Sequence, residues 1–119
     1  MSGRSPVGQA RRWTLEAAQQ MFPEVRDRTE RAVHQTESLI AERDALAEET
    51  PERAGLEERI QQAVQGWARE MEALGLAVKG LWLVDFDSGS GYYCWKWPEE
   101  RLEYYHTYEE GFEGRIRIQ

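Results

Sequence analysis

The spacing of apolar and small side chains predicts a long helix in the first half of the chain. From Phe22 to Leu46 these side chains recur at intervals of three and four residues, interrupted by Arg43, which places them on one face of an α-helix. Such a narrow stripe of small residues is typical of a helix that packs closely against another helix. Its members are Phe22, Val25, Thr29, Ala32, Thr36, Leu39 and Leu46.

Two signals lie near the start of this helical region. Thr14 is a good N-cap for a short helix over residues 15–21, because its hydroxyl can accept a hydrogen bond from a free backbone N–H. Pro23 then either begins a new helix at its first position or kinks the existing one. Residues 1–12 have almost nothing to bury, so we expect a disordered N-terminal tail.

A second helix is predicted over residues 52–74. Thr50 is its cap, Pro51 fits the first helical position, and Gly75 is placed to end it. The connection between the two helices is short, and their apolar stripes match, so we expect an antiparallel helical hairpin. The stripe of the second helix consists of Leu56, Ile60, Ala63, Val64, Trp67, Met71 and Leu74.

After the helical hairpin, the spacing of apolar residues changes from a helical pattern to one typical of strands. Residues 81–86 and 92–97 are strand candidates on either side of the turn-forming segment 87–91. Residues 102–107 are the third strand of a meander, and the alternating segment 115–118 is either an edge strand or a pairing site for a neighbouring chain.

These elements predict one α+β domain over residues 13–119. It consists of a long antiparallel helical hairpin, at about 15–75, followed by a small three- to four-stranded antiparallel sheet, at about 81–118. A chain of 119 residues forms a modest core, so a helical pair with one apolar stripe would gain from pairing with a second copy. We therefore expect a homodimer.

Composition narrows the partners and the compartment. The net charge of −7 argues against nucleic acid and against docking on anionic membranes, because both need a concentrated basic surface. Cys94 is the only cysteine, and no segment has the apolar core of a signal peptide or the length of a membrane span. We expect a cytoplasmic protein.

Ten of the thirteen aromatic residues lie between Trp82 and Phe112. In the second strand, alternation separates Tyr93 and Trp95 from Cys94. One face of the sheet must cover the helices, and the other presents several aromatic rings. Such a patch marks either an oligomer contact or a ligand surface.

Cys94 and His106 are the residues with the most chemical potential. Cys94 is flanked by aromatic residues, and we interpret it as a buried small hydrophobic residue rather than a nucleophile, for which His106 would be the base. We assign no catalytic residue, and the sequence does not decide whether the chain is an enzyme. The alternative is a metal site formed by His106 with Glu109 or Glu110, together with Asp85 and Cys94.

Arg115 follows two glycines in the segment 111–115. Its guanidinium could reach back to the sheet, and this contact has two alternative interpretations. The favoured one is an ion pair with Asp85 that pins the tail, and the other is a clamp for a carboxylate or phosphate.

Several segments resemble the prokaryotic DUF2203 family, a family of small proteins without an assigned activity. The resemblance covers nearly the whole chain after residue 12 and therefore implies a family name but no substrate or cofactor. The matching segments are Trp13–Ala18, Phe22–Val25, Val78–Gly80, Leu83–Phe86, Cys94–Trp95, Tyr105–His106 and Gly111–Arg115.

The leading functional hypothesis is a homo-oligomeric interaction or scaffold module, with a further protein as a second candidate partner. The alternative is a small-molecule- or metal-binding protein, possibly catalytic, and its cofactor is not identified by the sequence. For that alternative the candidate ligand-binding residues are Asp85, Cys94, Trp95, His106 and Arg115, and the candidate metal ligands are His106 and Glu110. The alternative requires Cys94 and His106 to lie on the same face of the sheet.

Overall fold

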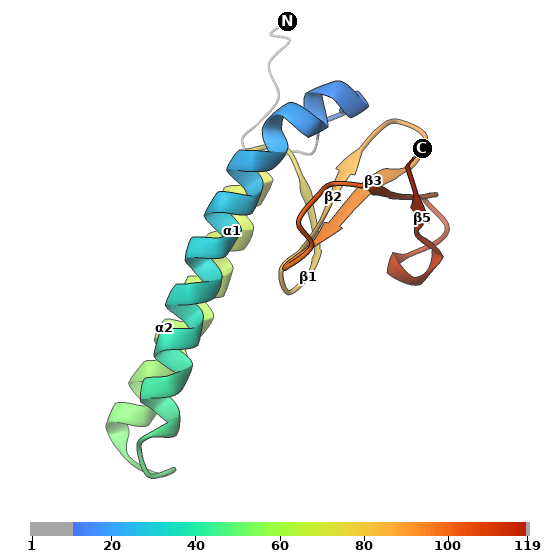
Figure 1. Ribbon diagram of the computed structural model, residues 1–119. Helices are drawn as coiled ribbons and strands as arrows, with labels where there is room; N and C mark the ends of the chain where they lie inside the picture. The colour runs from blue at the N-terminus through green and yellow to red at the C-terminus, as the bar shows by residue number, and fades with distance from the viewer. Residues whose placement is uncertain (1–10, 119) are drawn as a thin grey trace, which may run out of the picture.

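The computed structural model describes residues 11–118. This part of the chain folds into two layers, a long helical hairpin and an antiparallel sheet that packs beside one end of it (Figure 1). The predicted α+β class and its order of elements are confirmed. The elements are α1 (Leu15–Asp44), α2 (Pro51–Ala73), β1 (Ala77–Gly80), β2 (Leu83–Asp87), β3 (Tyr92–Lys96), β4 (Tyr104–His106), the short 3-10 helix η1 (Phe112–Gly114) and β5 (Ile116–Arg117).

Both helices begin at the predicted caps. The hydroxyl of Thr14 accepts a hydrogen bond from the backbone N–H of Ala17, and the hydroxyl of Thr50 accepts one from Arg53. Of the two alternatives for Pro23, the structure shows a residue inside one continuous helix. α1 changes direction near its N-terminal end (Figure 1), as expected where a proline removes a backbone hydrogen bond.

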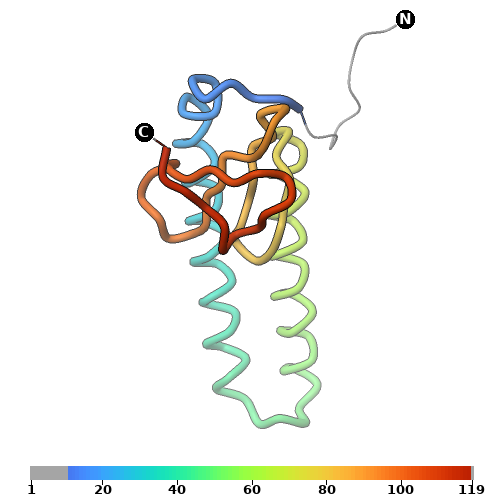
Figure 2. Tube along the Cα trace, turned by 90° about the vertical axis from the view of Figure 1, so that its right-hand side faces the viewer, coloured from blue at the N-terminus to red at the C-terminus, as the bar shows by residue number. Residues whose placement is uncertain are grey.

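The helical stripes face each other inside the hairpin. Leu39, Leu56 and Trp67 are all buried within this single chain. The sheet covers only the half of the hairpin near the N-terminus of α1 and the C-terminus of α2, while the other half projects beyond it (Figure 2). Neither helix in the described range carries an apolar stretch of the length and hydropathy needed to cross a bilayer.

Two buried threonines of α1 differ in their hydrogen bonding. The hydroxyl of Thr29 accepts a hydrogen bond of 2.8 Å from the indole N–H of Trp67. The hydroxyl of Thr36 has no hydrogen-bond partner among the described residues. A buried polar group without a partner costs free energy, whereas a paired one does not.

We therefore predict opposite effects for the same substitution at these two positions. Thr36→Val should leave the free energy of unfolding unchanged or raise it by about 1 kcal/mol, because it removes an unpaired hydroxyl. Thr29→Val should lower it by about 1–3 kcal/mol, because it leaves the N–H of Trp67 unpaired. Urea denaturation of both variants measures this, and equal effects would contradict the assignment of the two hydroxyls.

The sheet of the described region has five strands in the order β1-β2-β3-β4-β5, all antiparallel. The predicted edge strand at the C-terminal end is confirmed as β5. β1 was not predicted, because alanine, lysine and glycine have low strand propensity. The chain reverses at Leu81 and Trp82, where Trp82 has a φ of 60°, and a sequence of apolar residues gives no sign of such a turn.

One face of the sheet packs against the helices. Trp95 meets Phe22 of α1 edge-to-face at 5.4 Å, and Phe86 meets Trp13 in the same way at 5.2 Å. Val84, Phe86 and Trp95 have no exposed surface. Because side chains alternate across a strand, their neighbours Asp85 and Cys94 lie on the opposite face of the sheet.

Residues 11–13 are attached to the sheet rather than belonging to a tail. Arg12 forms a parallel β-bridge with Asp87, and the backbone N–H of Trp13 donates to the carbonyl of Asp87 at 2.7 Å. The indole N–H of Trp13 donates to the carbonyl of Gly75. The predicted tail therefore ends earlier than expected, and its residues 1–10 lie outside the described part of the chain.

Candidate metal centre

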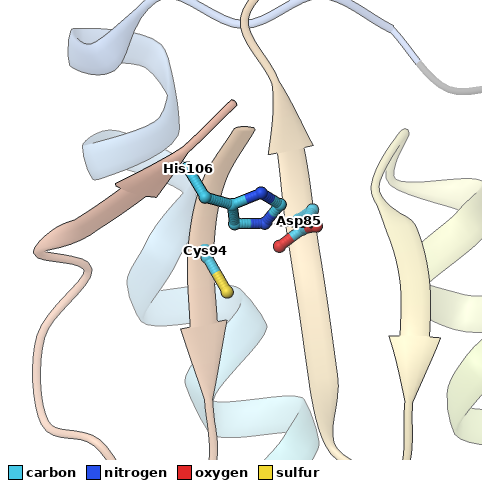
Figure 3. A group of neighbouring side chains, drawn as sticks. All are labelled: Asp85, Cys94 and His106. Carbon is cyan, nitrogen blue, oxygen red and sulfur yellow. Dashed lines mark hydrogen bonds and ion pairs between the residues drawn. The ribbon is translucent and has the colours of Figure 1, made fainter. Parts of the chain in front are cut away.

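Three side chains converge on the sheet face that points away from the helices. Asp85 of β2 and Cys94 of β3 are direct cross-strand neighbours. His106 of β4 lies opposite Tyr92 of β3, which is two residues before Cys94 and on the same face of the sheet. Figure 3 shows the three side chains pointing toward one another from adjacent strands. Their potential ligand atoms all lie within 4.8 Å of one another. The relative exposures are only 1% for Asp85, 1% for Cys94 and 4% for His106.

The hydrogen bond of His106 to Thr107 places a proton on Nδ1 of the ring. Nδ1 lies 2.8 Å from the carbonyl oxygen of Thr107, and since a carbonyl only accepts, Nδ1 donates. Nε2 lies 3.0 Å from Oδ2 of Asp85. An unprotonated ring nitrogen and a carboxylate oxygen both accept, so this second contact needs one more proton or another cation between the two atoms.

The thiol of Cys94 is neutral in this environment. Burial and the neighbouring Asp85 carboxylate raise the pKa of Cys94 far above its ordinary value, and the opposing effect of the Arg115 charge is smaller. A nucleophilic cysteine needs a lowered pKa. The geometry therefore agrees with the interpretation of Cys94 as a poor nucleophile.

Asp85 has spare bonding capacity. Its Oδ2 contacts His106 and lies 4.0 Å from the ammonium of Lys79. Its Oδ1 is buried, and within residues 11–118 it has no hydrogen-bond partner. A buried carboxylate oxygen without a partner is unfavourable, and a bound ion is one of the groups that satisfies it.

A pocket of about 380 Å³ opens beside the three side chains. The segment after β4 forms one wall, and it is tethered by a hydrogen bond of 2.6 Å from the hydroxyl of Tyr108 to Asp87. Burial opposes ionisation of Asp87, but hydrogen bonds from Tyr108 and from the N–H of Gly89 lower its pKa. The pocket is lined by Lys79, Leu83, Asp85, Tyr92, Cys94, His106, Tyr108, Glu109, Glu110, Gly111 and Phe112.

The three side chains suit a borderline-soft transition metal. Zinc binds thiolate, imidazole and carboxylate, and sites with three protein ligands keep a fourth position for water or substrate. The backbone carbonyl of Thr107 holds the far ring nitrogen of His106, as such partners do for metal-binding histidines. Tetrahedral zinc holds its ligand atoms roughly 3.3–3.6 Å apart, so small side-chain movements suffice to complete the site.

The structure brings together three of the five residues predicted for ligand binding, whereas Trp95 lies on the other face of the sheet and Arg115 approaches Cys94 but is paired with Glu99. Trp95 lies on the helix-facing side of the sheet, where its indole N–H donates to the carbonyl of Glu99 at 2.8 Å. Arg115 forms an ion pair of 2.8 Å with Glu99, not with Asp85. The predicted Arg115–Asp85 pair is therefore wrong, because β5 places Arg115 beside the turn after β3.

Glu110 and Lys79 also line the pocket, and only Glu110 was a predicted site residue. Glu110 lines the pocket, but its carboxylate lies against Gly114, and the compact group of ligand atoms within the described residues contains Asp85, Cys94 and His106 alone. Sequence reasoning did not single out Lys79 for the site, because it lies on the unpredicted strand β1.

Comparisons with known proteins give a family without an assigned activity. The model of a family described as "Uncharacterized conserved protein (DUF2203)" matches residues 11–118. Neither a curated protein nor a solved structure was found to match the sequence. The match spans all the elements of the fold and the three converging side chains, and the chain belongs to the DUF2203 family.

Proposed function

We propose that this protein binds a divalent transition-metal ion, with zinc as the preferred ion, through Asp85, Cys94 and His106. The observation that carries the proposal is the convergence of three different buried ligand types on one sheet face. This arrangement meets the requirement that Cys94 and His106 share a face. The fourth position faces the pocket, so the ion is accessible to a small ligand.

A purely structural role for the three residues accounts for less of the geometry. A structural Asp–His pair would satisfy both partners, yet Oδ1 of Asp85 stays without a partner in residues 11–118. Burying charged groups in this way is costly unless the charges are fully paired. A cation held between Asp85 and His106 would pair the buried carboxylate, whose Oδ1 could bind the same ion, and a thiolate ligand favours zinc over magnesium or calcium.

Cobalt(II) titration of the purified, chelator-treated protein tests the proposal. Cobalt takes the same geometry as zinc in such sites and absorbs light, so we expect one equivalent to give tetrahedral d–d bands and a sulfur-to-cobalt charge-transfer band. Zinc should then displace the cobalt. The proposal fails if neither cobalt nor zinc binds, or if cobalt binds without a sulfur ligand.

The affinity for the metal should rise with pH. Binding as a thiolate releases the proton of Cys94, so below the thiol pKa the apparent affinity rises about tenfold per pH unit. For an ordinary thiol this dependence would level off near pH 8.5. Because the pKa of Cys94 is raised, we expect the affinity to keep rising up to at least pH 9 in competition titrations with a chelator.

The scaffold hypothesis stays a prediction. Its main argument was an apolar helical stripe that needed a partner, and in this fold Leu39, Leu56 and Trp67 of that stripe are buried within one chain. Aspartate at these positions would therefore unfold the protomer whether or not it dimerises. Sedimentation of the native chain, rather than these substitutions, measures the oligomeric state.

A further inference from the structure

We infer that the pocket beside the metal ligands binds a small oxyanion, a carboxylate or phosphate group, between the ion and the ammonium of Lys79. This inference rests on the proposed metal site and assigns the chemical class of its fourth ligand. It is carried by the position of Lys79, the cationic side chain that lines the open side of the site among the described residues.

Lys79 lies where it would meet the fourth ligand. Its ammonium is 4.0 Å from Oδ2 of Asp85 and 4.2 Å from the centre of the Tyr92 ring. The Tyr92 ring in turn packs against the ring of His106 at 5.3 Å. The cation–π contact restrains the ammonium beside the ligands, and its side chain is 39% exposed, so it faces the pocket rather than the core.

The charges of the site favour an anion once the metal is bound. A divalent ion balances the carboxylate of Asp85 and the thiolate of Cys94, and the nearby Arg115 is paired with Glu99. Lys79 then leaves one positive charge. Without an anion, the ammonium and the metal ion repel each other across only a few ångströms. An oxyanion that binds the metal through one oxygen and Lys79 through another removes this repulsion, and such charge-assisted hydrogen bonds are strong.

Two carboxylates also line the pocket, and they do not cancel this preference. The carboxylate of Glu110 lies against Gly114. Glu109 is exposed on the segment after β4, where water and salt screen its charge. The volume of about 380 Å³ is at the small end of ligand sites, so a small molecule fits better than a polymer.

The test measures anion binding to the cobalt-loaded protein. Acetate and inorganic phosphate are titrated separately, and the shift of the cobalt d–d bands gives each affinity and shows which oxyanion class is preferred. We expect Lys79→Met to weaken anion binding by about 10-fold to 100-fold, the worth of one charge-assisted hydrogen bond. In the absence of anion, Lys79→Met should bind cobalt more tightly than the native chain, because the repulsion is gone.

Two variants serve as controls. Lys96→Met removes the only other lysine, which is not among the residues that line the pocket, and it should leave anion affinity within about threefold. Lys79→Arg keeps the charge and should retain anion binding. The inference is overturned if cobalt binds but neither anion shifts its spectrum, or if Lys79→Met and Lys96→Met have equal effects. Failure of cobalt to bind the native chain would instead overturn the proposed metal site itself.

Discussion

An Asp85→Asn variant is expected to bind zinc at least about 100-fold more weakly than the native chain. The substitution preserves the size of the side chain but removes the negative charge and one of three metal ligands. Loss of groups that merely orient a ligand already costs 10–100-fold in affinity, so loss of a ligand costs more. Zinc at 100 times its dissociation constant should stabilise the native chain by about 2.7 kcal/mol, and the variant should show almost none of this stabilisation in thermal denaturation.

Asp87→Asn is the matched control. Asp87 lies on the same strand and the same face as Asp85, but its carboxylate contacts Tyr108 and the backbone of Gly89. Asparagine keeps an oxygen that can accept both hydrogen bonds, so zinc affinity should change by less than about threefold. Equal zinc affinities for the native chain and Asp85→Asn would show that Asp85 is not a ligand.

Trp95→Ala should lower the free energy of unfolding by about 3–5 kcal/mol. The indole has no exposed surface, packs edge-to-face against Phe22, and donates its N–H to Glu99. Its removal leaves a large cavity between the sheet and α1, which the surrounding side chains fill only in part. Guanidinium denaturation with circular dichroism detection measures the loss, which is a large fraction of the stability of an average domain.

Trp97→Ala provides the comparison for Trp95. Trp97 follows β3 and is only partly buried, so its loss should cost about 1–2 kcal/mol. If Trp95 were instead a ligand-binding residue, Trp95→Ala would leave the unfolding curve unchanged and weaken ligand binding. That result would contradict the position of Trp95 on the helix-facing side of the sheet.

The helical half of the fold was predictable because its signals are local. Thr14 and Thr50 mark the two helix starts, and the stripes repeat over many turns. The effect of Pro23 was not predictable from the sequence alone, since a proline can begin a helix or lie within a bent one. β1 was missed because its strand character comes from pairing with β2 rather than from its own residues.

The candidate site was predictable only in part. Alternation along a strand places Cys94 on one face, but the convergence of Asp85, Cys94 and His106 depends on the registers of two strand pairs. Register between strands follows from the packing of whole faces and from turn geometry, which no single motif records. The predicted partner of Arg115 was wrong for the same reason. Asp85 and Glu99 were both available as carboxylate partners, and only the path of β5 selects Glu99.

The strict alternation of faces in β2 and β3 restricts how chains of this family can change in length. Inserting or deleting a single residue within either strand would exchange its two sets of side chains, turning Cys94 toward the helices and Trp95 toward the pocket. We expect such length changes to be eliminated by selection in both strands. The projecting half of the hairpin, which the sheet does not cover (Figure 2), can gain or lose helical turns while the spacing of the three ligands stays the same.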